Sequence, residues 1–251
     1  FSGVPVGEKR LIRENSMNTQ DMQIRTFPFR RENLALELEQ TQEEYCLFLD
    51  EEDIYPEEMP EKLAALMEEP GTAFAMPAAM LQDGEEVGKE AAGLQKEGSR
   101  ILQTNEAPPV IPTGLAGLLF RTRELRAAWE AVSDGADPEK QVLVRLLQQK
   151  PKFGFCGECL LQYAQPREQD AQYNPYALEA SWYREPLERF LLPSLRESAA
   201  ESGEASAFLQ RLAVYMVHIR IQSNLNNRNK HVLEREELPA FRELIRDVYR
   251  F

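Results

Sequence analysis

The stretch YCLFLDEEDIYPEEM, residues 45–59, places four acidic residues directly after a short apolar run. The run from Tyr45 to Leu49 is typical of a buried strand, since it is short, apolar and sharply bounded. The carboxylates of Asp50 to Asp53 then have two open interpretations. They form either a hydrated turn that favours the start of the next helix, or a strand end whose oxygen atoms bind a hard divalent cation such as Mg²⁺ or Mn²⁺. The charge run alone favours the hydrated turn.

The segments around this stretch predict an alternation of helices and strands. Residues 32–44 are predicted to form a helix with Leu34 and Leu38 on one face. A second amphipathic helix over residues 60–68 opens with a proline, and the apolar run over residues 71–81 predicts another strand. A helix–strand–helix–strand order is typical of a parallel or mixed sheet covered by helices, so we expect an α/β fold.

The middle of the chain continues this alternation after a polar excursion over residues 82–100. An apolar strand that leads into a helix is predicted within PPVIPTGLAGLLFRTREL, residues 108–125. Another helix begins at Asp137, where aspartate suits the N-cap and the proline that follows suits the first helical position. This helix leads into two strand-like pieces, residues 153–156 and 160–163.

The two ends of the chain differ in character. Residues 1–30 are predicted to form strands and turns, because glycines and prolines punctuate them. Apolar side chains recur three and four residues apart in three later segments, which predicts helices over residues 179–198, 206–225 and 236–251. We therefore expect an α/β domain over residues 1–165, followed by a helical C-terminal subdomain over residues 166–251.

Composition and charge argue against several classes of protein. The chain has 251 residues and 43% apolar residues, which suits a globular protein with a sizeable core. Its net charge of −13 argues against nucleic acid as a partner, because phosphate backbones bind basic surfaces. We see no secretory signal peptide and no apolar run of the about 18 residues that a membrane span needs. The first residue is Phe1 rather than Met, which is typical of an excised domain or of a chain whose beginning is missing.

The cysteine content favours a reducing, cytoplasmic setting. Three cysteines do not suggest a disulfide framework. Cys156 and Cys159 form a CxxC pair, but a structural zinc site needs about four Cys or His ligands. Cys46, His218 and His231 are not spaced as further ligands. The sequence therefore argues against zinc or redox chemistry at this pair.

The absence of familiar motifs narrows the chemistry further. The sequence contains no GxGxxG, Walker A, GxSxG or HExxH motif. Both histidines lie in the helical tail, so a Ser–His or Cys–His nucleophile pair is not expected. The acidic strand end is therefore the strongest candidate site, because ligands bind beyond the carboxyl ends of strands in open α/β sheets. A cation held there would stabilise a diphosphate leaving group.

The surroundings of the acidic residues resemble the family 2 glycosyltransferases of the GT-A fold. These enzymes share an Asn-containing helix, a Gly-Glu-Tyr lead-in, the motif FLDSDD and a following proline. The present chain has Asn33 in the helix, Glu44-Tyr45 in the lead-in and LDEED, residues 49–53, at the acidic motif. The tail segments SWYREPLERFLLPSL, FLQRLAVYMVHIRI and NLNNRNKHVL are similar to bacterial members that make cell-surface polymers, some of which carry a CDP-glycerol glycerophosphotransferase domain. The resemblance covers roughly residues 27–251.

The resemblance implies a GT-A-like mixed sheet flanked by helices and a metal-assisted, inverting transfer. A sugar or a glycerol-phosphate-type group would pass from a nucleotide-diphosphate donor to a glycan or polyol acceptor. Asp50, Glu52 and Asp53 occupy the acidic triplet, which would bind the donor and hold Mg²⁺ or Mn²⁺. Glu139 is the candidate base that deprotonates the acceptor hydroxyl, with Asp137 as the alternative. A helix N-cap is an equally good interpretation of Asp137.

Several positions depart from the family pattern. Arg167 is the nearest cation to the place of an Arg-rich segment that contacts the donor. Glu52 replaces the usual aspartate, and Pro138 interrupts a Glu-Asp pair at the base. Residues 1–25 lack the usual first strand with its nucleotide-binding aspartate, so the donor-binding segment is not visible. A non-catalytic binding or assembly module with the same fold is therefore the alternative function.

The resemblance also implies partners and a location. We expect a nucleotide-sugar donor, no nucleic acid, and peripheral association with a membrane-bound synthesis complex. The expected location is the cytoplasm, at the inner face of the membrane, and assembly into a homo-oligomer is compatible with the sequence. A third interpretation is an unrelated acidic α/β protein whose tail packs helices against a partner.

Overall fold

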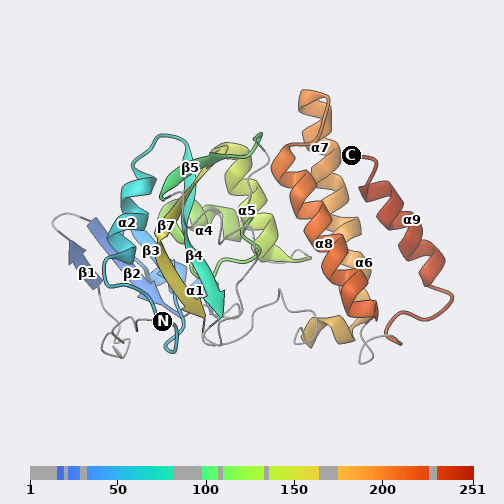
Figure 1. The fold of residues 1–251 in the computed structure, drawn as a ribbon, viewed down its shortest axis with the longest axis horizontal. Helices are drawn as coiled ribbons and strands as arrows, with labels where there is room; N and C mark the ends of the chain where they lie inside the picture. Colours follow the sequence, from blue (N-terminus) through green and yellow to red (C-terminus); the bar gives the residue numbers. More distant parts are fainter. Residues whose placement is uncertain are drawn as a thin grey trace, which may run out of the picture.

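The computed structural model describes residues 16–19, 22–28, 33–81, 98–106, 110–132, 136–163, 175–225 and 231–251. Within these residues, seven strands form one mixed sheet in the order β1-β2-β3-β6-β4-β7-β5. The strands are β1 (Ser16–Thr19), β2 (Met22–Phe27), β3 (Tyr45–Phe48), β4 (Thr72–Leu81), β5 (Arg100–Gln103), β6 (Leu119–Arg121) and β7 (Lys152–Tyr163). Because β2, β3, β4 and β7 are mutually parallel, their carboxyl ends lie at the same edge of the sheet (Figure 1).

Helices cover both faces of the sheet. The covering helices are α1 (Leu34–Gln40), α2 (Met59–Met67), α4 (Thr122–Glu130) and α5 (Pro138–Gln149). Alternate residues of β3 enter different cores, as the pleat of a strand requires. Tyr45 and Leu47 join the cluster around α2, whereas Cys46 and Phe48 join the cluster around α4 and α5. The sheet is thus buried on both faces, which explains why its central strands have continuous apolar sequences.

The chain after the sheet forms a helical tail, seen at the right of Figure 1. Its elements are the 3₁₀ turn Pro175–Leu178, α6 (Ala180–Pro186), the π-helical turn η2 (Leu187–Leu191), α7 (Leu192–Ser202), α8 (Ala207–Leu225) and α9 (Leu238–Val248). The π turn directly follows Pro186, which lacks a backbone N–H and therefore interrupts the regular hydrogen bonding of α6. Helix α6, η2 and α7 consequently continue one another with a change of register rather than as one regular helix.

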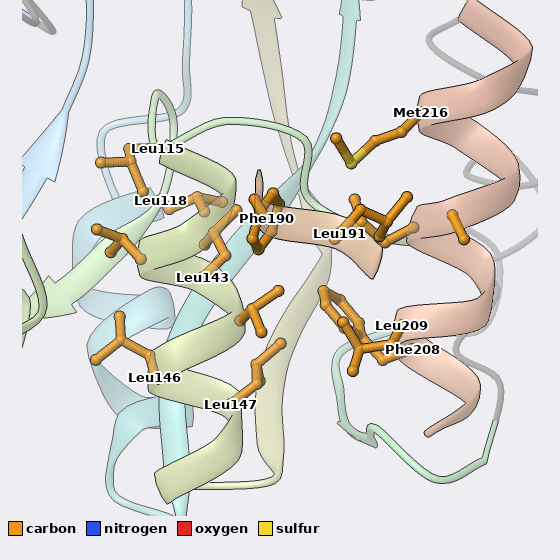
Figure 2. Packing of buried hydrophobic residues seen from close by; sticks show 14 of the residues in the cluster. Leu115, Leu118, Leu143, Leu146, Leu147, Phe190, Leu191, Phe208, Leu209 and Met216 are labelled. Carbon is orange, nitrogen blue, oxygen red and sulfur yellow. The ribbon is translucent and has the colours of Figure 1, made fainter. Parts of the chain in front are cut away.

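Buried apolar side chains join the tail to the α/β part. Figure 2 shows Phe190 and Leu191 between leucines of α5 and side chains of α8. Phe208 of α8 packs edge-on against Phe153 of β7, with ring centroids 6.5 Å apart. The Phe208 backbone N–H also donates to the Thr104 carbonyl oxygen at 2.9 Å. One hydrophobic cluster therefore extends from the sheet into the tail.

Most of the expected architecture is confirmed. The chain has the predicted α/β fold, with a mixed sheet flanked by helices and followed by helices. The helix expected over residues 32–44 is shorter and ends at Gln40, and the two strand pieces after α5 are one bulged strand. Strand β5 was not predicted. The predicted division between residues 165 and 166 falls outside the described residues and stays a prediction.

None of the described helices is long and apolar enough to cross a lipid bilayer.

Candidate active site at the carboxyl edge of the sheet

The acidic residues after β3 form a tight turn. The Asp53 backbone N–H donates to the Asp50 carbonyl oxygen at 3.1 Å. In return, the Asp50 backbone N–H donates to Oδ2 of Asp53 at 3.0 Å, and Asp53 is only 9% exposed. Glu51 and Glu52, by contrast, are exposed. The Asp53 carboxylate therefore shapes the turn that presents the other carboxylates, so the turn and binding-site interpretations are compatible.

The turn is fixed to the neighbouring part of the sheet edge. Ile54 and Gln162 exchange two backbone hydrogen bonds of 3.0 and 2.8 Å, which form an isolated antiparallel bridge. Gln162 lies at the carboxyl end of β7, one residue before the strand ends. The acidic turn is consequently held at both ends, by β3 before it and by β7 after it.

A glycine-containing segment, residues 114–118, connects the acidic turn to α5. The Gly117 backbone N–H donates at 2.6 Å to the carbonyl oxygen of Phe48, which lies two residues before Asp50. Two residues earlier, the Leu115 backbone N–H donates to Oε2 of Glu139 at 3.2 Å. Since a residue spans at most about 3.6 Å, the Glu139 carboxylate lies within about 13 Å of the end of β3. The structure thus brings Glu139 to the same edge as the acidic turn.

Asp137 has a structural role that the sequence only partly predicts. It occupies the N-cap position of α5 in a left-handed conformation, with φ 60° and ψ 60°, but its side chain makes no capping hydrogen bond. Instead, its carboxylate forms an ion pair with Lys140, whose Nζ lies 3.1 Å away and which is only 3% exposed. The predicted N-cap is therefore right in position, while the side chain neutralises a buried lysine.

The candidate residues are partly brought together. Asp50, Glu52 and Asp53 share one turn, and Glu139 is linked to that turn through the segment over residues 114–118. Among the described residues, no group of three or more His, Cys, Asp or Glu side chains is arranged to hold a metal ion. The predicted Mg²⁺ or Mn²⁺ site stays a prediction. Arg167 lies outside the described residues.

The segment over residues 114–118 is the part of the site that sequence reasoning missed. Gly117 has φ +79°, and a Cβ there would lie 2.7 Å from Cδ2 of Leu161 and 3.0 Å from the Tyr163 hydroxyl oxygen. A Cβ at Gly114 would lie 2.9 Å from Oε2 of Glu139. The two glycines in PTGLAG were the available signal, because closely spaced glycines often mark a close approach of the backbone.

We expect Gly117→Ala to destabilise the protein by about 2–4 kcal/mol, because it adds a steric clash to left-handed strain. Gly203→Ala is a matched control, since Gly203 has φ +90° but a Cβ there meets nothing within 4 Å. The control should lose only about 1 kcal/mol, from strain alone. Urea denaturation measures both values, and equal losses would show that Gly117 is not closely packed.

Comparison with known proteins identifies the fold. No family model matches the sequence, and no curated protein matches it. Among solved structures, S. aureus TarS 1–349 in complex with UDP-GlcNAc matches with a TM-score of 0.53 and 16% identity, covering 85% of this chain and 59% of TarS 1–349. The UDP complex of the same protein matches with a TM-score of 0.49 and 16% identity, over 85% of this chain and 58% of the other. The chain therefore shares the α/β fold of TarS, which confirms the predicted GT-A-like fold class, and it spans less than two thirds of the TarS chains that it matches.

Proposed function

We propose that the chain binds a nucleotide-diphosphate sugar at the carboxyl edge of its sheet and transfers the sugar to a hydroxyl acceptor. The hydrogen-bonded connection from Phe48 through Gly117 and Leu115 to Glu139 carries the proposal. It holds a turn rich in carboxylates and a separate carboxylate at one sheet edge, where open α/β sheets bind ligands. Such an arrangement supplies a donor-binding group and a base from different elements.

The acidic turn suits a divalent cation when the donor completes the coordination. Mg²⁺ commonly uses one or two carboxylates, water and substrate phosphates rather than a complete set of protein ligands. Asp50, Glu52 and Asp53 would supply the carboxylates, and the hydrogen bond from the Asp50 N–H to Oδ2 of Asp53 fixes how the turn presents them. The cation would stabilise the charge that develops on the departing diphosphate.

Glu139 is the proposed general base. Its position on the first turn of α5 and its hydrogen bond from the Leu115 N–H fix the orientation of the carboxylate. In the transfer, the acceptor oxygen would form a bond to the sugar carbon as the bond from that carbon to the diphosphate breaks. Glu139 would take the acceptor proton. Asp137 would act as a positioning residue through its ion pair with the buried Lys140.

The finer parts of the function belong to the same proposal. TarS 1–349 forms a complex with UDP-GlcNAc, so a uridine nucleotide sugar is the first donor to test. The acceptor would be a glycan or polyol of a cell-surface polymer, made at the inner face of the membrane with a synthesis complex. Because one fold can host enzymes for different substrates, assays rather than the fold identify the sugar and the acceptor polymer.

Glu52→Gln tests the donor site, because it removes one proposed metal ligand while keeping the side-chain size. Calorimetry should show Mn²⁺-dependent binding of UDP or CDP to the wild type, and binding should weaken at least about tenfold in the variant. Glu51→Gln is the matched control, since Glu51 is the exposed neighbour and loses the same charge. Equal weakening in both variants would indicate a general charge effect and contradict metal ligation by Glu52.

A non-catalytic binding or assembly module is the second candidate. It is favoured by the use of Asp53 within the turn, where its carboxylate accepts the Asp50 N–H. The same calorimetry separates the two functions. No binding of either nucleotide, with or without Mn²⁺, would contradict the enzyme proposal and leave the module.

A further inference from the structure

The CxxC pair lies at a bulge in the middle of β7. Cys156 pairs with Pro77 of β4, and Leu160 pairs with Ala78, the next residue of β4. Residues 157–159 of β7 are therefore extra relative to the partner strand. In a regular strand, residues three apart would point to opposite faces. The bulge brings the side chains of Cys156 and Cys159 into the same cluster beneath α2.

The two sulfur atoms are in close contact. Their separation is 2.7 Å, which is shorter than the about 3.5–4.0 Å between ordinary nonbonded heavy atoms. A disulfide bond has an S–S length of about 2.05 Å. Both cysteines are free thiols in this structure. The bulge therefore already holds the pair close to the geometry that a disulfide needs, and only a small movement separates the two states.

Hydrogen bonds distinguish the two cysteines. Hydrogen bonds from the Cys159 thiol, from the Ser99 hydroxyl 3.4 Å from Sγ, and from the backbone N–H groups of Cys159 and Glu158 hold the pKa of Cys156 below its usual value. The same hydrogen bond raises the pKa of Cys159, which keeps its proton. Burial raises the pKa of Cys46 to about 12. Cys156 is thus the member of the pair that more readily forms a thiolate, Cys159 is the member that more readily keeps its proton, and Cys46 is not reactive.

We propose that Cys156 and Cys159 form a hydroperoxide-reactive dithiol site that closes to a disulfide. The Cys156 thiolate attacks a peroxide oxygen, the O–O bond breaks, and hydroxide or alkoxide leaves as Cys156 becomes a sulfenic acid. Cys159 then attacks that sulfur, the S–O bond breaks and water leaves with the Cys159 proton. The two thiols lose two electrons in total, and the peroxide gains them. A dithiol reductant reverses the change.

The side chains that cover Cys156 and Cys159 favour reaction with a small oxidant. Both cysteines are buried at 0% exposure. However, Glu158 between them is exposed, and so is Ser99, whose hydroxyl contacts Cys156 directly. Lys62 on α2, which is partly exposed, lies 3.4 Å from the Glu158 carboxylate and belongs to the same covering layer. A hydroperoxide is small enough to reach the thiolate through such a layer, whereas a protein disulfide is not.

Mass spectrometry of the folded wild-type chain tests the proposal directly. After treatment with hydrogen peroxide, unfolding and alkylation, the tryptic peptide over residues 153–167 should carry no alkyl group and weigh about 2 Da less than the reduced peptide. The number of alkylated cysteines should fall from three to one, with Cys46 the one that remains. Dithiothreitol should restore all three. An unchanged peptide, or one with Cys156 oxidised only to sulfinic acid, would overturn the proposal.

Three variants separate the roles of the cysteines. Cys159→Ser should stop at the sulfenic acid of Cys156, which dimedone traps, and Cys156→Ser should abolish the reaction. Cys46→Ser is the matched control and should form the disulfide as the wild type does. Circular dichroism checks that each variant is folded. The mass spectrometry of the wild-type chain tests the proposal even if a variant does not fold. Dimedone labelling on Cys159 in the wild type would reverse the two roles and contradict the assignment of Cys156.

Discussion

Glu139→Gln is expected to lower turnover of the donor by about 10²–10⁴-fold, the usual contribution of a general base. The amide cannot take the acceptor proton, but its oxygen can still accept the Leu115 N–H that holds the carboxylate in the wild type. The variant should therefore keep the segment over residues 114–118 in place and bind the donor with an affinity within about twofold of the wild type. Release of the nucleoside diphosphate from the donor identified by calorimetry measures turnover, and calorimetry measures affinity.

Asp137→Asn is the matched comparison for that experiment. It removes one negative charge two residues away and weakens the ion pair with Lys140, so it should reduce stability more than Glu139→Gln does. Its turnover should stay well above that of the Glu139 variant once both are measured on folded protein. The reverse order, with Asp137→Asn the less active variant, would transfer the role of base to Asp137.

Phe208→Ala is expected to lower the free energy of unfolding by about 3–5 kcal/mol, as for other fully buried phenylalanines. Phe208 is 2% exposed, and its ring lies between α8 and Phe153 of the sheet. Truncation would leave a cavity at the place where the tail meets the α/β part, and the backbone bond to Thr104 cannot compensate for the lost contacts.

Val214→Ala provides the control for Phe208→Ala, because Val214 lies on the same helix and is 53% exposed. It should change stability by less than about 0.5 kcal/mol.

Chemical denaturation followed by both tryptophan fluorescence and circular dichroism also tests the predicted division of the chain. Coincident transitions would show that sheet and tail unfold together, whereas two transitions in the wild type would support an independent subdomain over residues 166–251.

Local patterns predicted the elements but not the contacts between them. The apolar run before Asp50 and the spacing of Leu34 and Leu38 are set by burial within a few residues, so a strand and a helix follow from them. Strand β5 could not be found in this way, because it has four residues and only one of them, Leu102, is buried. The bulge at Cys156 also escapes a sequence pattern, since it depends on pairing with β4, about 80 residues away.

The candidate site shows the same division between local and distant information. The acidic turn is encoded within residues 50–53 and was visible in the sequence. The burial of Lys140 had a local signal in its acidic neighbour Asp137, three residues earlier, which the helical spacing brings within reach. For the link between Glu139 and Phe48, the two glycines of residues 114–118 signalled a close approach of the backbone but not its partners, because these depend on how the segment crosses the sheet edge.

The position of β6 has a consequence for the order in which the chain can fold. Among the described strand pairings, this three-residue strand joins β3 to β4, so it connects the first half of the sheet to the second. During synthesis, β3 and β4 must wait with unpaired edges until residues 119–121 leave the ribosome, and β4 gains its other partner only with β7. Long-range pairing of this kind slows folding and exposes strand edges to aggregation. We therefore expect nascent chains to depend most on chaperones when the last residue that has left the ribosome lies between residues 81 and 119.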